Sequence, residues 1–184
     1  MLLQILTYTH HLTTMLFGIF LSAFFLGVKQ NKKNVCTLLG GGAVSGLFFL
    51  ICNTVFGSLF TEAVYPIFVH LPLFLLLVFY YRFRWLPSII SIMTAYLCCQ
   101  FSNWAGIFAL SLSGLEWVYY LVRIIVTVAV FAFLSRYLCQ TTALLFAKSD
   151  RELYILGAMP FVYYVFDYST TKFSMLLYSG NKVV

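Results

Sequence analysis

The chain has 184 residues, of which 62% are hydrophobic, 20% aromatic and only 9% charged, and its formal net charge is +6. A soluble domain of this composition would have too little polar surface to cover itself, so an ordinary soluble protein is excluded. The mean hydropathy of +0.97 indicates a chain whose solvent is lipid. Since the basic residues fall in short breaks between apolar stretches, they indicate membrane topology and not nucleic-acid binding.

Apolar stretches of about 17 to 25 residues with few charges are typical of membrane-spanning helices. The sequence contains six of them, and we expect an all-α, polytopic integral membrane protein that forms a single domain over residues 1–184. In chain order the predicted spans are residues 4–28, 35–57, 64–83, 87–110, 117–138 and 152–169. The first stretch has no basic n-region and no small-residue cleavage pattern, so we expect a retained helix and not a signal peptide.

The placement of charges orients these spans. Basic residues lie between spans 1 and 2, 3 and 4, and 5 and 6, namely Lys29, Lys32, Lys33, Arg82, Arg84, Arg136, Lys148 and Arg151. The opposite loops contain Glu62 and Glu116 and no basic residue. Because cytoplasmic loops carry an excess of Lys and Arg, the three basic loops are expected inside, with the N-terminus and the C-terminal tail outside.

The second predicted span begins with the small-residue segment CTLLGGGAVSG. Gly42 and Gly46, and likewise Gly41 and Ser45, are four residues apart, which lets two helix backbones approach closely. Such a face suits either a homodimer or packing against the first or third span of the same chain. We expect packing within the chain.

Six polar side chains lie within the spans, and the predicted topology places all six in the outer half of the membrane: Asn53, His70, Gln100, Asn103, Arg123 and Asp167. Polar groups inside a membrane are costly and often mark a functional site, so these six are the candidate ligand-binding or signal-binding residues. Together they predict an outward-facing polar cavity ringed by aromatic side chains. Such a cavity would suit an extracellular peptide or a small molecule.

Simpler roles remain open for these residues. Asp167, in PFVYYVFDYSTTKF, could pair with Arg123 across antiparallel spans, or it could reach the outer headgroup region, and we weigh the two equally. His70 alone is more simply explained as a neutral imidazole that donates to a backbone carbonyl loosened by Pro72. Gln100 and Asn103 share one helix face and could form interhelical hydrogen bonds that only fix packing.

Motifs of catalysis are absent. The sequence has no Walker motif, no H-E-x-x-H, no G-x-S-x-G and no paired intramembrane aspartates. Its five cysteines form no C-x-x-C pair and have no metal-ligand spacing with the histidines. We therefore expect no enzymatic activity, no metal and no other cofactor.

The order of elements, from LQILTYTHHLTTMLFG through six apolar spans to AKSDRELYILGAMPFVYYVFDYSTT and the tail LLYSGNKVV, resembles a known family. It resembles the N-terminal membrane sensor region of bacterial sensor histidine kinases of the GHKL ATPase type, which include receptors for quorum-sensing peptides. The resemblance covers essentially the whole chain and implies a signal-sensing domain of a two-component system in a bacterial plasma membrane. A parent protein would continue through one more helix to a dimerisation helix and an ATP-binding domain.

The phosphoacceptor segment and the nucleotide-binding boxes of that family do not occur in this sequence. No kinase residue is therefore assigned, and we expect an isolated sensor fragment. One alternative is the substrate-binding membrane subunit of a small-molecule transporter, similar in length and helix count to the vitamin-binding subunits of energy-coupling-factor transporters. That alternative prefers both termini inside. Another is a membrane scaffold without a ligand, in which the outer polar residues only hold helices together.

Overall fold

The computed structural model describes residues 1–57, 64, 66–147, 149–167 and 169–170. Over these residues the chain is all-helical and has no strand, which confirms the all-α part of the predicted fold class. The long helices are α1 (Leu2–Phe25), α2 (Lys32–Phe56), α5 (Trp85–Ser113), α6 (Glu116–Phe133) and α8 (Asp150–Asp167). The short segments are η1 (Pro66–His70), α4 (Leu71–Leu75), η2 (Leu76–Tyr80), η3 (Leu134–Leu138) and α7 (Cys139–Phe146), and the three η segments are π-helical.

The short segments continue their neighbours and form two longer helices. Segments η1, α4 and η2 make one helix from Pro66 to Tyr80, and α6, η3 and α7 make one helix of 31 residues, Glu116–Phe146. This second helix extends past residue 138, where the predicted span ended. Gly114 separates it from α5, with the left-handed φ of 65° that glycine adopts without strain.

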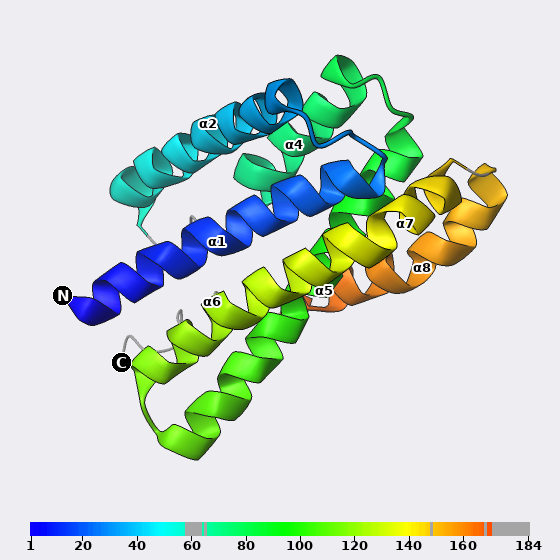
Figure 1. Cartoon of the computed structure of the whole chain (residues 1–184). Coiled ribbons are helices and arrows are strands. Elements are labelled where there is room, and N and C mark those ends of the chain that lie inside the picture. The colour runs from blue at the N-terminus through cyan, green and yellow to red at the C-terminus, as the bar shows by residue number, and fades with distance from the viewer. Residues whose placement is uncertain (58–63, 65, 148, 168, 171–184) are drawn as a thin grey trace.

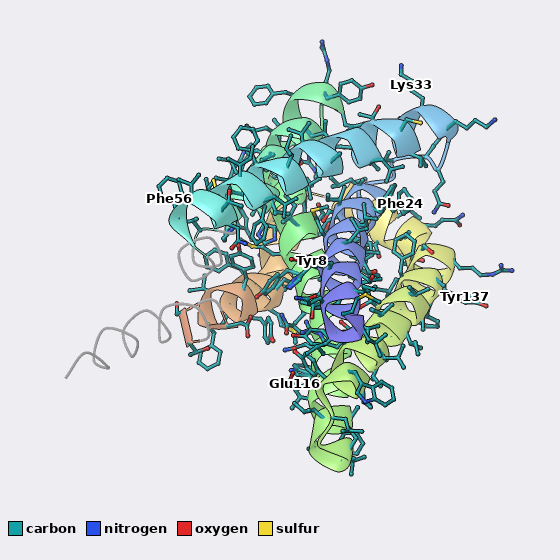
Figure 2. The ribbon with its side chains drawn as sticks, turned by 90° about the vertical axis from the view of Figure 1, so that its left-hand side faces the viewer. Tyr8, Phe24, Lys33, Phe56, Glu116 and Tyr137 are labelled. Carbon is teal, nitrogen blue, oxygen red and sulfur yellow. The ribbon has the colours of Figure 1, made fainter. Side chains whose placement is uncertain are left out.

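Successive helices run in opposite directions along the bundle (Figure 1). The connections that carry the basic residues therefore meet at one end, which we call the basic end. There Arg84 forms an ion pair with Asp150 at 2.8 Å, and a Cβ added at Gly27 would lie 3.4 Å from the Cβ of Ala143. In Figure 2, Lys33 marks the basic end of α2 and Phe56 its opposite end.

The apolar core lies in the half of the bundle next to the basic end. Four leucines from four different helices are completely buried there, namely Leu21, Leu38, Leu77 and Leu153. The second half of α1 supplies much of the remaining core, and its Phe24 and Phe25 rings pack near Phe131 and Phe146. The opposite half of the bundle is left for the polar side chains described below.

Three helices are long and apolar enough to cross a membrane: Lys32–Phe56, Trp85–Ser113 and Glu116–Phe146. They contain the fourth and fifth predicted spans and all of the second except residue 57. The third predicted span corresponds to the shorter apolar helix Pro66–Tyr80, while α1 and α8 cover most of the first and sixth. Many large apolar side chains on α2, α5 and α6 point outward, as is expected of helices that face lipid.

The small-residue face of α2 packs within the chain, as predicted. A Cβ added at Gly42 would lie 3.0 Å from Ile19 Cδ1, and one at Gly46 would lie 3.5 Å from Met15 Cε, so this face lies against α1. A Cβ at Gly41 would lie 3.4 Å from a methyl of Leu76 in η2. The glycines thus let α2 approach both the first helix and the third.

Candidate functional site

Polar side chains gather in two clusters in the half of the bundle away from the basic end. The aspartate cluster consists of His70, Tyr96, Tyr164 and Asp167. The arginine cluster consists of Gln100, Asn103, Tyr119 and Arg123. Helix α5 contributes to both, because its residues 96, 100 and 103 follow the i, i+4, i+7 spacing of a single helix face.

Among the described residues, two hydrogen bonds and three aromatic contacts join the members of the aspartate cluster. The hydroxyl of Tyr96 donates to Asp167 Oδ2 at 2.5 Å, and a hydrogen bond of 2.8 Å joins His70 Nδ1 to the hydroxyl of Tyr164. The Tyr96 ring packs edge-on against His70 and Tyr164, with centroid separations of 5.9 and 4.9 Å. The cost of placing a carboxylate among aromatic residues is thus offset in part by a charge-assisted hydrogen bond.

A glycine contact explains how α8 brings Tyr164 and Asp167 to this position. A Cβ added at Gly157 would lie 2.7 Å from Ile90 Cδ1, which is closer than real Cβ contacts allow. Helices α5 and α8 both start at the basic end, so this contact fixes their separation two turns before Tyr96 and Tyr164. The glycine therefore positions the aspartate cluster without belonging to it.

His70 closes a π-helical turn, Pro66–His70, just before Pro72. Proline has no backbone N–H and disturbs the regular hydrogen bonding of a helix, and π-helical turns are frequent at functional sites. The sequence predicted that Pro72 loosens this helix, and the change from π-helical to α-helical geometry occurs beside it. The partner of His70 Nδ1, however, is the Tyr164 hydroxyl, which the sequence did not predict.

The arginine cluster is a chain of hydrogen bonds from α6 to α5. Arg123 Nη1 donates to the hydroxyl of Tyr119, one turn earlier on α6. The Tyr119 hydroxyl donates to Asn103 Oδ1 at 3.4 Å, and Asn103 Nδ2 donates to Gln100 Oε1 at 3.3 Å. Gln100 is buried, so this series of hydrogen bonds leads from the Arg123 guanidinium into the interior between the helices.

Gly106 makes room for the Arg123 side chain. A Cβ at Gly106 would overlap Cγ of Arg123 and would lie 2.9 Å from its Cδ. The stem of the arginine therefore lies directly on the backbone of α5, and the residue as a whole is half-buried. Any larger residue at position 106 would displace it.

Two buried polar atoms beside this cluster make no hydrogen bond within the part of the chain that the structure describes. They are Arg123 Nε and Oγ1 of Thr127, one turn further along α6, whose side chain is 2% exposed. A buried polar group without a partner costs roughly 1–3 kcal/mol, and a charged one more. A hydrogen-bonding ligand that reached these atoms would recover part of that cost.

Helix α1 completes the surroundings of the arginine cluster. His10 is 3% exposed, its ring lies 5.9 Å from that of Tyr120, and its Nδ1 lies 3.3 Å from Thr14 Oγ1. Helix α1 packs against both α5 and α6, the two helices between which the Arg123 side chain lies.

The hypothesis that Arg123 pairs with Asp167 is wrong. Arg123 donates to Tyr119, Asp167 accepts from Tyr96, and the ion pair among the described residues is Arg84 with Asp150 at the basic end. The physical reason is packing, because α8 lies chiefly against α5 and not against its sequence neighbour α6. No hydrogen bond links the two clusters among the described residues.

The structure thus divides the six predicted site residues. His70 and Asp167 belong to the aspartate cluster, and Gln100, Asn103 and Arg123 to the arginine cluster. Asn53 lies near the end of α2, and within the described residues its side chain makes no hydrogen bond. Five residues of the site region were missed from sequence, namely His10, Tyr96, Tyr119, Thr127 and Tyr164. A helical spacing from Arg123 would have found Tyr119 and Thr127, four residues before and after it.

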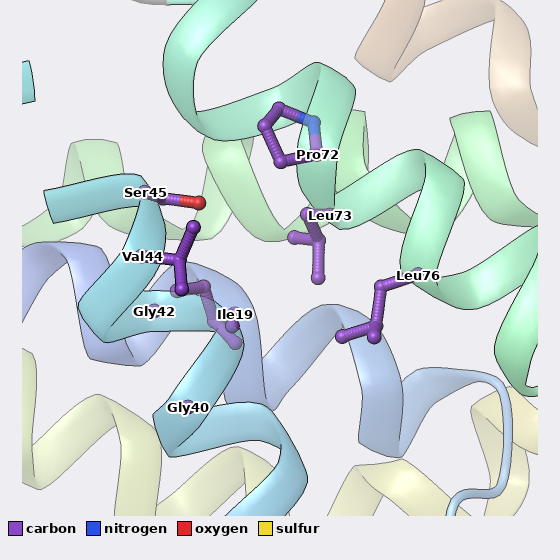
Figure 3. A pocket seen from close by; sticks show the side chains of 9 residues that line it. Ile19, Gly40, Gly42, Val44, Ser45, Pro72, Leu73 and Leu76 are labelled. Atoms are coloured by element: carbon purple, nitrogen blue, oxygen red, sulfur yellow. The ribbon is translucent and has the colours of Figure 1, made fainter. Parts of the chain in front are cut away.

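Two cavities among the described residues lie away from the clusters, and neither is lined by a cluster residue. The first, of about 210 Å³, lies between α2 and the Pro66–Tyr80 helix, where Gly42 and Val44 face Leu73 and Leu76 (Figure 3). The second, of about 320 Å³, lies at the basic end. Neither is the predicted outward-facing polar cavity.

Comparison of the chain with protein-family models, with curated proteins and with solved structures finds no match.

Proposed function

We propose that the chain is the signal-receiving membrane domain of a bacterial sensor histidine kinase, spanning the plasma membrane six times with its N-terminus outside. The observation that carries the proposal is the arginine cluster. The half-buried Arg123 has a buried Nε that forms no hydrogen bond within the described residues, and it lies beside the equally unbonded Thr127 hydroxyl. Both residues are on a helix that is long and apolar enough to cross a membrane. Intramembrane charges of this kind are functional candidates.

The arrangement of the loops supports the proposed topology. The three basic loops meet at one end of the bundle, and the Glu116 end of α6 lies at the other, so the charge asymmetry coincides with the axis of the bundle (Figures 1 and 2). Under the rule that basic loops stay inside, the basic end faces the cytoplasm and both polar clusters lie toward the outer face.

The proposed signal carries an acceptor group, such as a carboxylate, that binds Arg123 and Thr127. Planar guanidinium groups favour carboxylates because they can donate two parallel hydrogen bonds. Binding there would shift α6 against α5 at Gly106. Since Glu116–Phe146 is one continuous helix, the shift would be carried to the basic end, where a parent protein would hold its kinase.

The first test is the side of the membrane that Val184 occupies. Alkaline phosphatase and fluorescent-protein fusions at Val184 are compared in a bacterial host, with matched control fusions after Lys33 and after Gly114. High phosphatase activity at Val184 and at Gly114, with fluorescence at Lys33, is expected. Fluorescence at Val184 would contradict the six-span topology and with it the outward placement of the clusters.

The substrate-binding subunit of a small-molecule transporter is the second candidate. The observation that favours it is the apolar cavity of about 210 Å³ between α2 and the Pro66–Tyr80 helix, which could hold a small apolar molecule. A cytoplasmic Val184, with saturable binding of a small molecule to the purified chain, would favour this function over the sensor.

A further inference from the structure

The cavity at the basic end is lined by both basic and apolar side chains, and neither proposed function assigns it a ligand. Its volume is about 320 Å³, and it is lined by Leu26, Arg82, Phe83, Arg84, Pro87, Ala143, Phe146 and Ala147. Two arginines are thus set in an otherwise apolar wall. The wall is built from the ends of α1, α5 and α7, where three loops meet.

The two arginines are bonded differently. Arg84 Nη1 donates to Asp150 Oδ1 at 2.8 Å, and its Nη2 lies 3.5 Å from the carbonyl oxygen of Phe146, so its charge is balanced within the protein. Arg82 forms no ion pair and no hydrogen bond through its side chain within the described residues. One unbalanced guanidinium therefore remains at the cavity.

The backbone at Arg82 is also unusual. Its φ is 59°, which makes it the one residue other than glycine with a positive φ in the part of the chain that the structure describes. That conformation costs a side-chain-bearing residue of order 1–3 kcal/mol, and such positions cluster where a side chain serves a ligand. Glycine would fit this backbone better, so stability alone does not account for an arginine at position 82.

We propose that this cavity binds the phosphate of an anionic phospholipid headgroup, with Arg82 as its main partner and the lipid tail leaving along the apolar wall. The apolar lining favours a lipid over free phosphate, which would gain nothing from Leu26, Phe83 or Pro87. Trp85, next to Arg84, is 57% exposed, as is typical of an aromatic residue at headgroup level. Basic pockets between helices are suited to anionic headgroups.

The test measures lipid retained by the whole chain. The protein is purified from vesicles of phosphatidylcholine and phosphatidylglycerol in equal parts, and retained lipid is counted by native mass spectrometry. We expect preferential retention of phosphatidylglycerol. Retention should be about fivefold weaker in Arg82→Gln and Arg82→Gly, since one basic residue near a membrane surface contributes about 1 kcal/mol.

Two further variants make the test specific. Lys32→Gln removes the same charge from the same end of the bundle without touching the cavity, and it should retain phosphatidylglycerol like the parent. Ala147→Phe keeps every charge but fills the cavity, and it should lose the lipid. Arg82→Gly relieves the strained backbone, so its stability should equal or exceed that of the parent, and a loss of lipid cannot be ascribed to unfolding.

Three results would overturn the proposal. Equal retention of phosphatidylcholine and phosphatidylglycerol would show that no anionic headgroup is recognised. An equal loss in Lys32→Gln and Arg82→Gln would show only diffuse attraction to the basic end. Binding of inorganic phosphate to the parent, but not to Arg82→Gln, without retention of phosphatidylglycerol would assign the cavity to a free anion instead of a lipid.

Discussion

The aspartate cluster and the arginine cluster place opposite charges in the same half of the bundle, yet they are built differently. The bonds of the aspartate cluster join residues 71 and 94 positions apart, and thus tie α8 to α5 and to the third helix. Those of the arginine cluster join only the consecutive helices α5 and α6. The first cluster is therefore suited to holding distant parts of the fold together.

The clusters differ also in how completely their polar atoms are bonded. In the arginine cluster Arg123 Nε and Thr127 Oγ1 are buried and unbonded among the described residues, whereas Asp167 accepts a short hydrogen bond from Tyr96. A bonded charge stabilises the fold, while an incompletely bonded one can still accept a ligand group. Substitutions in the first cluster should therefore mainly change stability, and substitutions at Thr127 should not.

The largest effect is expected from Gly106→Ala. The added Cβ would displace the stem of Arg123 and break the hydrogen bonds of the arginine cluster, which should lower the free energy of unfolding by about 2–3 kcal/mol. The free energy of unfolding is measured by unfolding the protein in mixed detergent micelles. Gly18→Ala is the control, because nothing lies within 4 Å of a Cβ there, and alanine should raise helix stability by up to about 1 kcal/mol. Equal stability of the two variants would contradict the close packing of Arg123 on α5.

Tyr96→Phe should follow, with a loss of about 2 kcal/mol, because it leaves Asp167 without the hydroxyl donor. A double-mutant cycle with Asp167→Asn should give a coupling energy of about 1 kcal/mol or more. The matched cycle of Arg123→Gln with Asp167→Asn should give none, since the two residues belong to separate clusters. Coupling between Arg123 and Asp167, without coupling between Tyr96 and Asp167, would show that Arg123 and Asp167 form an ion pair after all.

Tyr164→Phe should have a smaller effect, about 1 kcal/mol, because the hydrogen bond to His70 is between neutral groups. The same detergent unfolding assay measures it. Tyr154→Phe, on the same helix but with its side chain exposed, should be unchanged and serves as the control. A loss at position 154 as large as that at position 164 would mean that the phenol oxygens of α8 stabilise the chain through solvent or lipid contacts and not through His70.

Much of the fold could be predicted from the sequence, because long apolar runs must form helices in lipid and charged breaks must connect them. Predicted spans 35–57 and 87–110 lie within or nearly within α2 and α5. The fifth helix extends to Phe146, beyond the predicted span 117–138. Arg136 resembles the end of a span, but the helix continues through it. Packing of Phe146 against Phe25 in the core favours that continuation.

The pairing of polar groups could not be predicted. Arg123 and Asp167 lie at similar depth on consecutive predicted spans, and nothing in the sequence shows that α8 packs on α5 through Gly157. Tyrosine is common at headgroup level because of its amphipathic ring alone. The sequence therefore does not show that Tyr96, Tyr119 and Tyr164 form hydrogen bonds. The sequence predicts the depth of each polar group in the membrane. Its hydrogen-bond partner depends on which helices pack against each other, which the sequence does not show.

The smallest effect, and the sharpest test of the comparison, is expected from Thr127→Val. Its hydroxyl is buried without a hydrogen bond, so replacing it with a methyl group of similar shape should leave stability unchanged or raise it by up to about 1 kcal/mol. Thr94→Val is the matched control on α5, where Oγ1 donates to the carbonyl of Ile90 at 2.7 Å, and it should lose about 1 kcal/mol. If both variants lose equally, the Thr127 hydroxyl has a partner in the folded protein. The arginine cluster would then be as fully bonded as the aspartate cluster, and the argument that it is open to a ligand would fail.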